Sequence, residues 1–290
     1  MTLLAEAWLL LFLLAAGLAA GAIAALAMGH LLGDAWLRAV RPGLEAAARA
    51  APLLLPLSLP VLLLMGRLYH WVASPPVDPI HAAWFAPAFF AARVLGALAL
   101  WTALGRWLLA GDRGALHPRR AGVVLLLLLP TAGVAAQDLA LSRDLSWFGS
   151  LQGFALMVGA AAAALAGAAF MALLRRGLPH PENLDGLERA LLTLGMAVLW
   201  LWFVQFVVAW AGNLPEEAAW YGRRGEGIWF WVKFGLALPA LLAAIALSLA
   251  PRWRAWRLGA VCALLFAHHA AQVAWVVVPD SPALRAAVAA

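Results

Sequence analysis

The chain has 290 residues, of which 66% are hydrophobic and 12% are charged. Soluble domains carry roughly 25% charged residues, so this composition excludes an ordinary soluble protein and predicts a polytopic membrane protein. The single cysteine, Cys262, excludes a disulfide within the chain, an iron–sulfur cluster held by cysteines of this chain and a covalently attached c-type haem.

Eight apolar runs, each about 20 residues or longer, are long enough to cross a hydrocarbon core of roughly 30 Å. They cover residues 3–31, 50–71, 83–110, 120–141, 148–175, 187–212, 227–250 and 255–279. The first run is too long and too continuous for a cleaved signal peptide, so we expect it to remain as the first span. The short connections predict that consecutive spans run antiparallel in an all-α membrane fold.

Basic residues are divided unevenly between the two ends of these spans. The richer end holds Arg38, Arg41, Arg49, Arg106, Arg113, Arg119, Arg120, Arg175, Arg176, Arg189, Arg252, Arg254 and Arg257. The other end holds Arg67, Arg143, Arg223, Arg224, Lys233 and Arg285. The positive-inside rule therefore predicts that the richer end is cytoplasmic and that both termini are periplasmic. On this interpretation the net charge of +6 reflects topology, and no nucleic-acid partner is expected.

Proline residues interrupt three of the predicted spans. Pro52, Pro56 and Pro60 recur every fourth residue and therefore share one face of the second span. Pro130 and Pro239 lie in the fourth and seventh spans. Each proline removes a backbone donor, so the carbonyl one turn earlier needs another partner in protein or water. The pattern fits either kinks that serve packing or a polar cavity.

Small residues follow one face of two spans. Gly17 and Gly21 form a GxxxG pattern in the first span, and residues 159–169 read GAAAAALAGAA in the fifth. Small side chains let the backbones of membrane helices approach closely. We therefore expect close helix contacts along both segments.

Polar side chains inside the spans are candidates for function, because a charge at the centre of a membrane helix costs about 2.5–3.5 kcal/mol on insertion scales. The set is Arg93, Gln137, Asp138, Gln152, Gln205, Lys233, His268, His269 and Gln272. Arg93 and Asp138 carry opposite charges at similar depth on consecutive antiparallel spans, which predicts an ion pair. That pair could staple two helices, or it could form a site for a quinone headgroup or a proton near the outer surface.

The adjacent histidines His268 and His269 raise the question of haem b, which needs two axial ligands on facing helices. The other histidines fall at helix ends or in loops, so neither residue has a histidine partner inside the membrane. We therefore predict hydrogen-bonded or proton-relaying imidazoles and no metal site.

Residues 203–221 read FVQFVVAWAGNLPEEAAWY, an apolar helix that stops at a polar, acidic and aromatic turn. Gly and Asn suit a helix C-terminus, and the following proline prevents continuation. Together with residues 70–84 and 142–149, this turn gives the predicted outer face many Trp, Pro and acidic residues. It predicts docking contacts from His70, Trp71, His81, Trp147, Asn213, Glu216, Glu217 and Trp220.

Several segments resemble a known family. LWLWFVQFVVAWAGNLPEEAAWY (199–221) is similar to the GNLPEE-containing stretch of the second polytopic subunit of alternative complex III, the ActF type of the wider NrfD/PsrC-like family. WFAPAFFAARVLGALALW (84–101) and AAQDLALSRDLSWFGSLQG (135–153) resemble the family segments that carry an arginine and an aspartate. The resemblance places Arg93 and Asp138 on these two positions.

The resemblance implies a subunit of a quinol:cytochrome c oxidoreductase in the bacterial inner membrane, built as two four-helix bundles, here residues 1–145 and 146–290. It implies no redox cofactor in this chain, with quinone or quinol as the possible ligand. Iron–sulfur clusters and haem c would lie in partners, namely a periplasmic iron–sulfur protein and a multihaem cytochrome c, beside a paralogous polytopic NrfD/PsrC-like subunit in the lipid bilayer. The implied quinol or proton site comprises Arg93, Asp138, Gln205, His269 and Gln272.

Two departures from the family pattern leave alternatives open. Family members often have ten spans, and near the last helix they carry Arg and Asp where this chain has His269 and Gln272. A passive membrane anchor with a stapling ion pair is therefore the main alternative. A haem-handling enzyme of eight spans would need paired intramembrane histidines, and a transporter would be expected to show a clear repeat with paired broken helices. The sequence shows neither pattern, which disfavours both alternatives.

Overall fold

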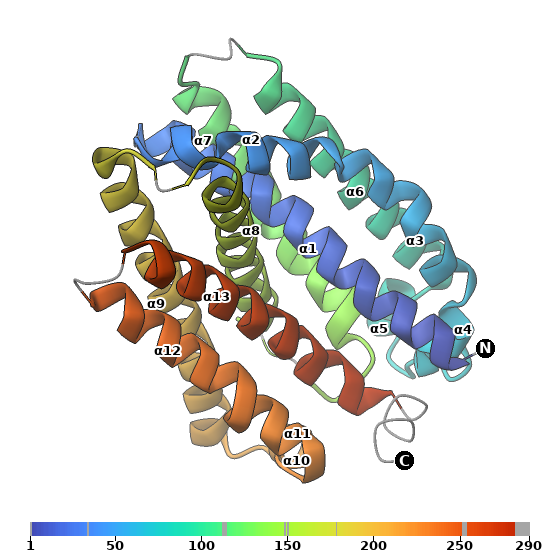
Figure 1. The fold of residues 1–290 in the computed structure, drawn as a ribbon. Coiled ribbons are helices and arrows are strands. Elements are labelled where there is room, and N and C mark those ends of the chain that lie inside the picture. The colour runs from blue at the N-terminus through green and yellow to red at the C-terminus, as the bar shows by residue number, and fades with distance from the viewer. Residues whose placement is uncertain are drawn as a thin grey trace.

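The computed structural model describes residues 2–33, 35–111, 115–147, 149, 151–177, 179–250 and 254–281. Within these ranges the chain is built of helices and contains no strand (Figure 1). Among the described residues, eight helical segments are long and apolar enough to cross a membrane, which confirms the predicted number of spans and a multi-pass membrane protein.

The spans follow the sequence in order, and short helices lie between them. They are α1 (Thr2–Leu32), α2 with η1 and α3 (Trp36–Arg49, Ala51–Leu53, Leu54–Leu63), α6 (Pro87–Leu109), α7 with η3 (Pro118–Ala136, Gln137–Leu141), α8 (Gln152–Arg176), α9 (Pro181–Gly212), α11 with η4 and α12 (Gly227–Phe230, Trp231–Ala237, Leu238–Leu249) and α13 (Arg254–Val277). The short elements are α4 (Met65–Leu68), η2 (His70–Val72), α5 (Pro79–Trp84), α10 (Pro215–Arg224) and η5 (Val278–Asp280).

The second span begins earlier than the sequence predicted, at residue 36 rather than 50. Helix α2 is amphipathic, and its buried side chains recur every third or fourth residue from Trp36 to Ala48. That face packs against α1, α6, α8 and α9, while Arg38 and Arg49 lie on the exposed side. Hydropathy alone did not predict α2 as part of this span, because the charged face of the helix lowers its mean hydropathy. Pro52 lies in the 3₁₀ turn that separates α2 from α3, so this proline marks a bend.

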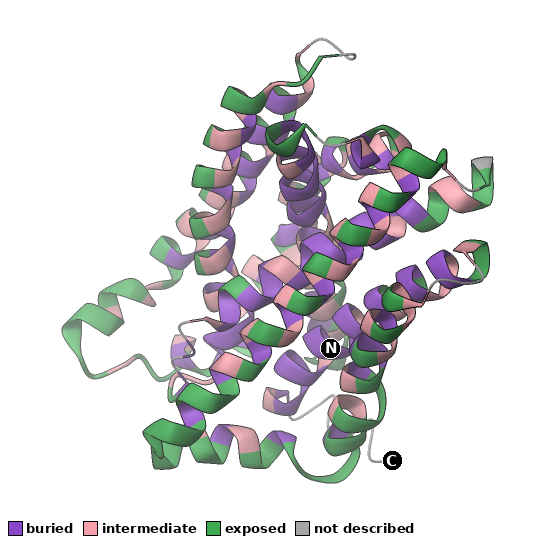
Figure 2. Cartoon of the chain, turned by 90° about the vertical axis from the view of Figure 1, so that its left-hand side faces the viewer, coloured by how far each residue is buried: buried purple, intermediate pink, exposed green. Residues whose placement is uncertain are grey.

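Helices α1, α8 and α13 form the centre of the molecule, and Figure 2 shows buried residues concentrated inside and exposed residues along the outer helices. The backbones of α1 and α8 approach closely at Gly21, where an added Cβ would lie 2.4 Å from the carbonyl oxygen of Ala160. This contact confirms the close approach predicted from the small residues. Helices from both halves meet here, and the division into bundles at residues 145 and 146 stays a prediction.

Contacts between distant segments identify the two ends of the helix assembly. At one end, the ring of His30 lies 5.8 Å from that of His117, and Arg254 pairs with Asp185. At the opposite end, Arg143 contacts Glu6. The first end carries most of the arginines that were assigned to the cytoplasm. Three of the counted arginines, Arg113, Arg252 and Arg285, lie outside the described residues.

Candidate functional site

Arg93 and Asp138 meet between α6 and the π-helical end of the fourth span. Nε of Arg93 donates to Oδ2 of Asp138 at 2.9 Å, and Nη2 donates to Oδ1 at 3.0 Å. The side chains are 12% and 3% exposed. Two parallel charge-assisted hydrogen bonds fix both distance and orientation. The structure therefore brings together the two charged residues that the sequence pattern paired.

Aromatic rings and a backbone carbonyl complete the surroundings of the Arg93 guanidinium. Its carbon lies 4.1 Å from the ring centre of Trp84 and 4.5 Å from that of Phe89. Nη1 donates to the backbone carbonyl of Trp84 at 2.7 Å. Cation–π contacts of this kind contribute about 0.5–2 kcal/mol, the larger value when water is excluded. Helix α5, which carries Trp84, thus positions the cation.

A π-helical turn orients Asp138. The amide of Ser142 donates to the carbonyl of Gln137 at 2.9 Å, five residues back, and the Ser142 hydroxyl donates to the Asp138 carbonyl at 2.5 Å. Tyr69 donates its hydroxyl hydrogen to the carbonyl of Leu139 at 2.9 Å. Burial raises the pKa of Tyr69, which keeps the phenol protonated as a donor. These bonds satisfy backbone groups that the π turn takes out of the regular helical pattern.

Hollows border the Arg93–Asp138 pair on two sides. A groove of about 270 Å³ runs along α6 and α7 and is lined by both charged residues, Gly96 and Pro130, on a face that points away from the helix core. A pocket of about 330 Å³ lies under α5 and reaches Asp138, His81 and Trp147. The groove lies on the outward side of α6 and α7, whereas the pocket lies beneath α5. Asp138 lines both hollows.

Among the described residues, the other three candidates of the predicted site, Gln205, His269 and Gln272, form no hydrogen bond or ion pair with the Arg93–Asp138 pair and have surroundings of their own. Gln205 accepts a hydrogen bond from the amide of Leu151 at 3.2 Å, so it fixes the start of α8. Gln272 accepts from Lys233 at 2.7 Å in the second half of the chain. Which partner each side chain contacts depends on the direction in which it points from its helix. The depth of a residue in the membrane, which the sequence predicts, does not determine that direction.

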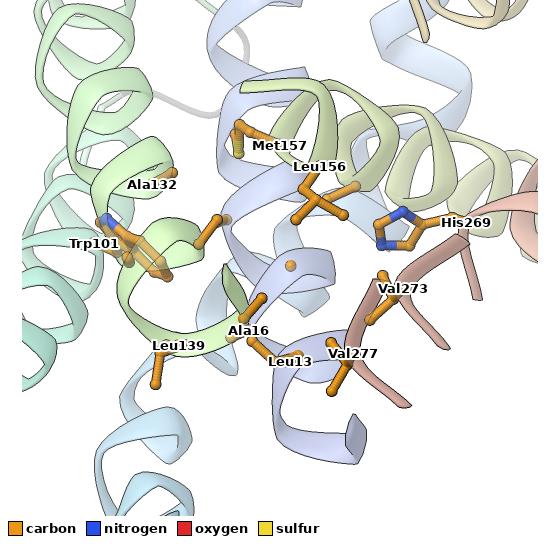
Figure 3. Close-up of a pocket in the computed structure, with 16 residues that line it drawn as sticks. Leu13, Ala16, Trp101, Ala132, Leu139, Leu156, Met157, His269, Val273 and Val277 are labelled. Atoms are coloured by element: carbon orange, nitrogen blue, oxygen red, sulfur yellow. The ribbon is translucent and has the colours of Figure 1, made fainter. Parts of the chain in front are cut away.

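His269 borders an internal cavity of about 60 Å³ between α1, α7, α8 and α13 (Figure 3). The imidazole is 4% exposed, and its Nε2 has no hydrogen-bond partner. It fits between two glycines, since an added Cβ at Gly17 or Gly159 would lie 3.6 or 3.2 Å from a ring nitrogen. The lining is otherwise almost entirely apolar, and a stable buried water needs two to four polar partners. A hydrogen-bonded route from His269 is therefore not supported.

His268 is held differently from its neighbour. Its Nδ1 lies 2.8 Å from the carbonyl oxygen of Ala237 in the seventh span. Among the residues that the structure describes, no group of three or more His, Cys, Asp or Glu side chains could hold a metal ion. His268 thus joins α13 to the end of η4 through a hydrogen bond.

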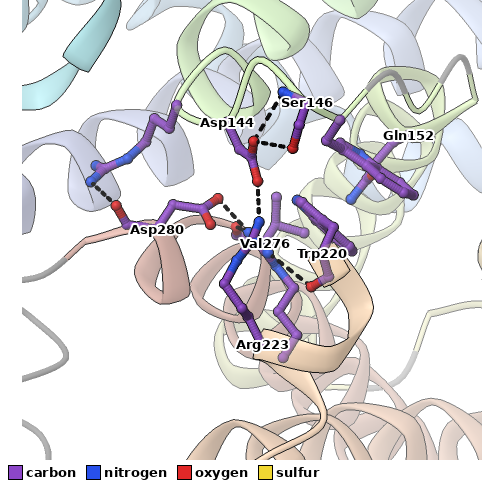
Figure 4. Close-up of polar contacts among 10 residues, drawn as sticks. Asp144, Ser146, Gln152, Trp220, Arg223, Val276 and Asp280 are labelled. Atoms are coloured by element: carbon purple, nitrogen blue, oxygen red, sulfur yellow. Dashed lines mark hydrogen bonds and ion pairs between the residues drawn. The ribbon is translucent and has the colours of Figure 1, made fainter. Parts of the chain in front are cut away.

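A cluster of buried ion pairs at the end opposite His30 was not predicted. Arg143 lies 3.5 Å from Glu6 and donates to the carbonyl of Asp280 at 3.2 Å. Asp280, labelled in Figure 4, also pairs with Arg224. Burial lowers the pKa of Arg224 to about 10, and Asp280 opposes this shift. The cluster links α1, the connection after the fourth span, α10 and the end of α13. Glu6 is an acid within the first apolar run, and it was the one feature of the sequence that could have indicated this cluster.

An aromatic stack adjoins this cluster. The rings of Trp147 and Trp220 are stacked with centres 4.2 Å apart, and Trp147 donates to Gln152. Arg223 of α10 pairs with Asp144 on the same connection (Figure 4). Two of the three connections that were predicted to face the periplasm, the one after the fourth span and the one after α9, therefore pack against each other.

The predicted docking residues divide by exposure. Trp71, Trp147 and Trp220 are 1–2% exposed and fill the interior of the chain, so their side chains offer little surface to a partner, and their role in docking stays a prediction. The remaining candidates are exposed or half-buried, namely His70, His81, Asn213, Glu216 and Glu217. The large aromatic rings in these connections pack against other side chains of the same chain. The sequence pattern could not distinguish such internal packing from a binding interface.

No family model matches the sequence, and no curated protein matches it.

Proposed function

We propose that the chain is an integral subunit of a quinol:cytochrome c oxidoreductase of the alternative complex III type in the bacterial inner membrane. The observation that carries this proposal is the bidentate Arg93–Asp138 pair at the wall of an outward-facing groove. The resemblance of residues 84–101, 135–153 and 199–221 to that family supports it independently of the geometry. The eight spans agree with a membrane subunit of this kind.

The chemistry of the pair suits the oxidation of a quinol. Conversion of a quinol to a quinone releases two electrons and two protons. In this proposal the quinol headgroup enters the groove along α6 and α7. Asp138 accepts the two protons one after the other and releases the first before it takes the second, and Arg93 stabilises the carboxylate before each transfer. The electrons pass to iron–sulfur or haem c centres of partner subunits. The pocket under α5, which reaches His81, offers the proton a way toward the helix ends.

The proposed orientation puts this chemistry on the periplasmic side. The arginine-rich end is then cytoplasmic under the positive-inside rule, and both termini are periplasmic. Exposed residues near the other end, including His70, His81, Asn213 and Glu216, would contact the periplasmic iron–sulfur protein or the multihaem cytochrome c. A paralogous membrane subunit would pack against the helices within the bilayer.

A passive anchor remains the second candidate, because the pair is already well satisfied. Both oxygens of Asp138 accept hydrogen bonds from Arg93, and the surrounding turn is fixed by Tyr69 and Ser142. Such an arrangement would hold α6 to the fourth span without binding a quinol. In that case the groove would hold lipid chains only.

Replacement of Asp138 by asparagine separates the two candidates. The quinol site predicts that turnover of the isolated complex falls by about 100-fold or more, since a positioned acid or base contributes typically 10²–10⁴-fold. Asp185→Asn is the matched control, because Asp185 also pairs with an arginine, Arg254, but at the opposite end. Unchanged turnover, inhibitor affinity and proton release in assembled Asp138→Asn complex would reject the quinol site and favour the anchor.

A further inference from the structure

Lys233 occupies a polar position inside the seventh span. Its ammonium donates to Oε1 of Gln272 at 2.7 Å and lies 4.9 Å and 4.6 Å from the ring centres of Trp202 and Trp275. Helices α9 and α13 and the π-helical segment η4 therefore meet around one cation. Among the described residues, no carboxylate forms an ion pair with Lys233.

The position of Lys233 parallels that of Arg93. Arg93 and Lys233 lie the same number of residues after the start of their spans, at Pro87 and Gly227. Both are at the end of the assembly that holds Asp144 and Arg223. Each pairs with the next span, and each contact involves a π-helical segment and at least two aromatic rings. The partners differ in charge. Asp138 neutralises Arg93, whereas the neutral Gln272 leaves the charge of Lys233 uncompensated.

Hydrogen-bond donors around Lys233 also lack acceptors. Nε2 of Gln272 and Nε1 of Trp202 are buried and have no partner, and these side chains are 1% and 9% exposed. The ammonium itself has three donors, of which Gln272 takes one. Buried donors without partners cost about 1–3 kcal/mol each. A negatively charged group with several acceptors beside the ammonium would compensate its charge and accept its remaining hydrogens.

We propose that Lys233, Gln272 and Trp202 form a binding site for the phosphodiester of an anionic phospholipid. A phosphodiester carries a negative charge and accepts hydrogen bonds without donating one. Lys233 is half-buried rather than enclosed, and its neighbours Trp231 and Phe234 are 67% and 50% exposed, which gives the acyl chains an apolar surface. A quinone carbonyl would accept a hydrogen bond but would leave the cation uncompensated, so the charge favours the phospholipid.

The test measures lipid retained by the full chain after purification in mild detergent, by native mass spectrometry, with phosphatidylglycerol as the added probe. Lys233→Met is expected to weaken phosphatidylglycerol binding by about 10- to 100-fold, the loss typical of a hydrogen bond to a charged group. Lys233→Arg should retain binding. Gln272→Glu keeps the lysine but supplies a carboxylate, and we expect it to release the lipid as well.

Arg67→Met is the control, because Arg67 is an exposed cation near the same end and should leave binding unchanged. Equal retention by wild type, Lys233→Met and Gln272→Glu would overturn the proposal. Displacement by inorganic phosphate at concentrations comparable to the lipid would identify a site for soluble anions instead, and recovery of a quinone in place of phospholipid would also reject it. Lipid retention is measured without turnover, so this result is independent of the proposed oxidoreductase function.

Discussion

Replacing Arg93 by methionine tests whether a buried, coupled ion pair holds α6 to the fourth span. The change removes the cation and leaves the Asp138 carboxylate, whose side chain is 3% exposed, without a partner. Removing one member of a buried pair typically costs about 3–5 kcal/mol, because the remaining charge stays buried. We therefore expect Arg93→Met to lower the free energy of unfolding by about 3–5 kcal/mol.

The measurement is reversible unfolding in mixed detergent micelles, followed by tryptophan fluorescence, for both single variants and the double variant Arg93→Met/Asp138→Asn. The double variant removes both charges, so its loss should be smaller than the sum of the single losses by about 0.5–3 kcal/mol. Arg254→Met is the control. Its pair with Asp185 is 40% and 52% exposed, and exposed pairs contribute only about 0–1 kcal/mol.

The outcome that would refute this reasoning is strict additivity. If the losses of Arg93→Met and Asp138→Asn simply add in the double variant, the two charges do not stabilise each other. The same conclusion would follow if Arg93→Met were no more destabilising than Arg254→Met. Either result would also remove the geometric basis of the proposed quinol site.

Two further changes test the packing and the π turn. Gly21→Leu should destabilise the chain by about 1–3 kcal/mol in the same unfolding assay, because its Cβ would collide with the carbonyl of Ala160. Gly96→Ala is the control and should have little effect, because no atom lies within 4 Å of the added Cβ. Tyr69→Phe removes the hydrogen bond to Leu139 and should cost about 0.5–1.5 kcal/mol. Burial raises the pKa of Tyr69 above the ordinary value of a tyrosine, which is about 10, so this contribution should be complete below pH 10 and decline at higher pH. A difference in thermal unfolding that already changes between neutral pH and pH 9 would contradict this assignment.

The number of spans, and the approximate limits of all but the second, could be read from the sequence because hydrocarbon thickness sets the length of an apolar helix. The pairing of Arg93 with Asp138 was predictable for a related reason. Two opposite charges at similar depth on neighbouring antiparallel helices have few other partners in a membrane. The close contact at Gly21 likewise followed from its small side chain.

Only the tertiary structure decided which polar groups share a site. Gln205, His269 and Gln272 lie at suitable depths, yet each points to a different neighbour, because the direction of a side chain depends on the rotation of its helix and on the π turns. Glu6 and Arg143, 137 positions apart, meet through helix packing that no local pattern encodes. Depth in the membrane is a one-dimensional property of the sequence, whereas a binding site depends on how separate helices turn toward one another.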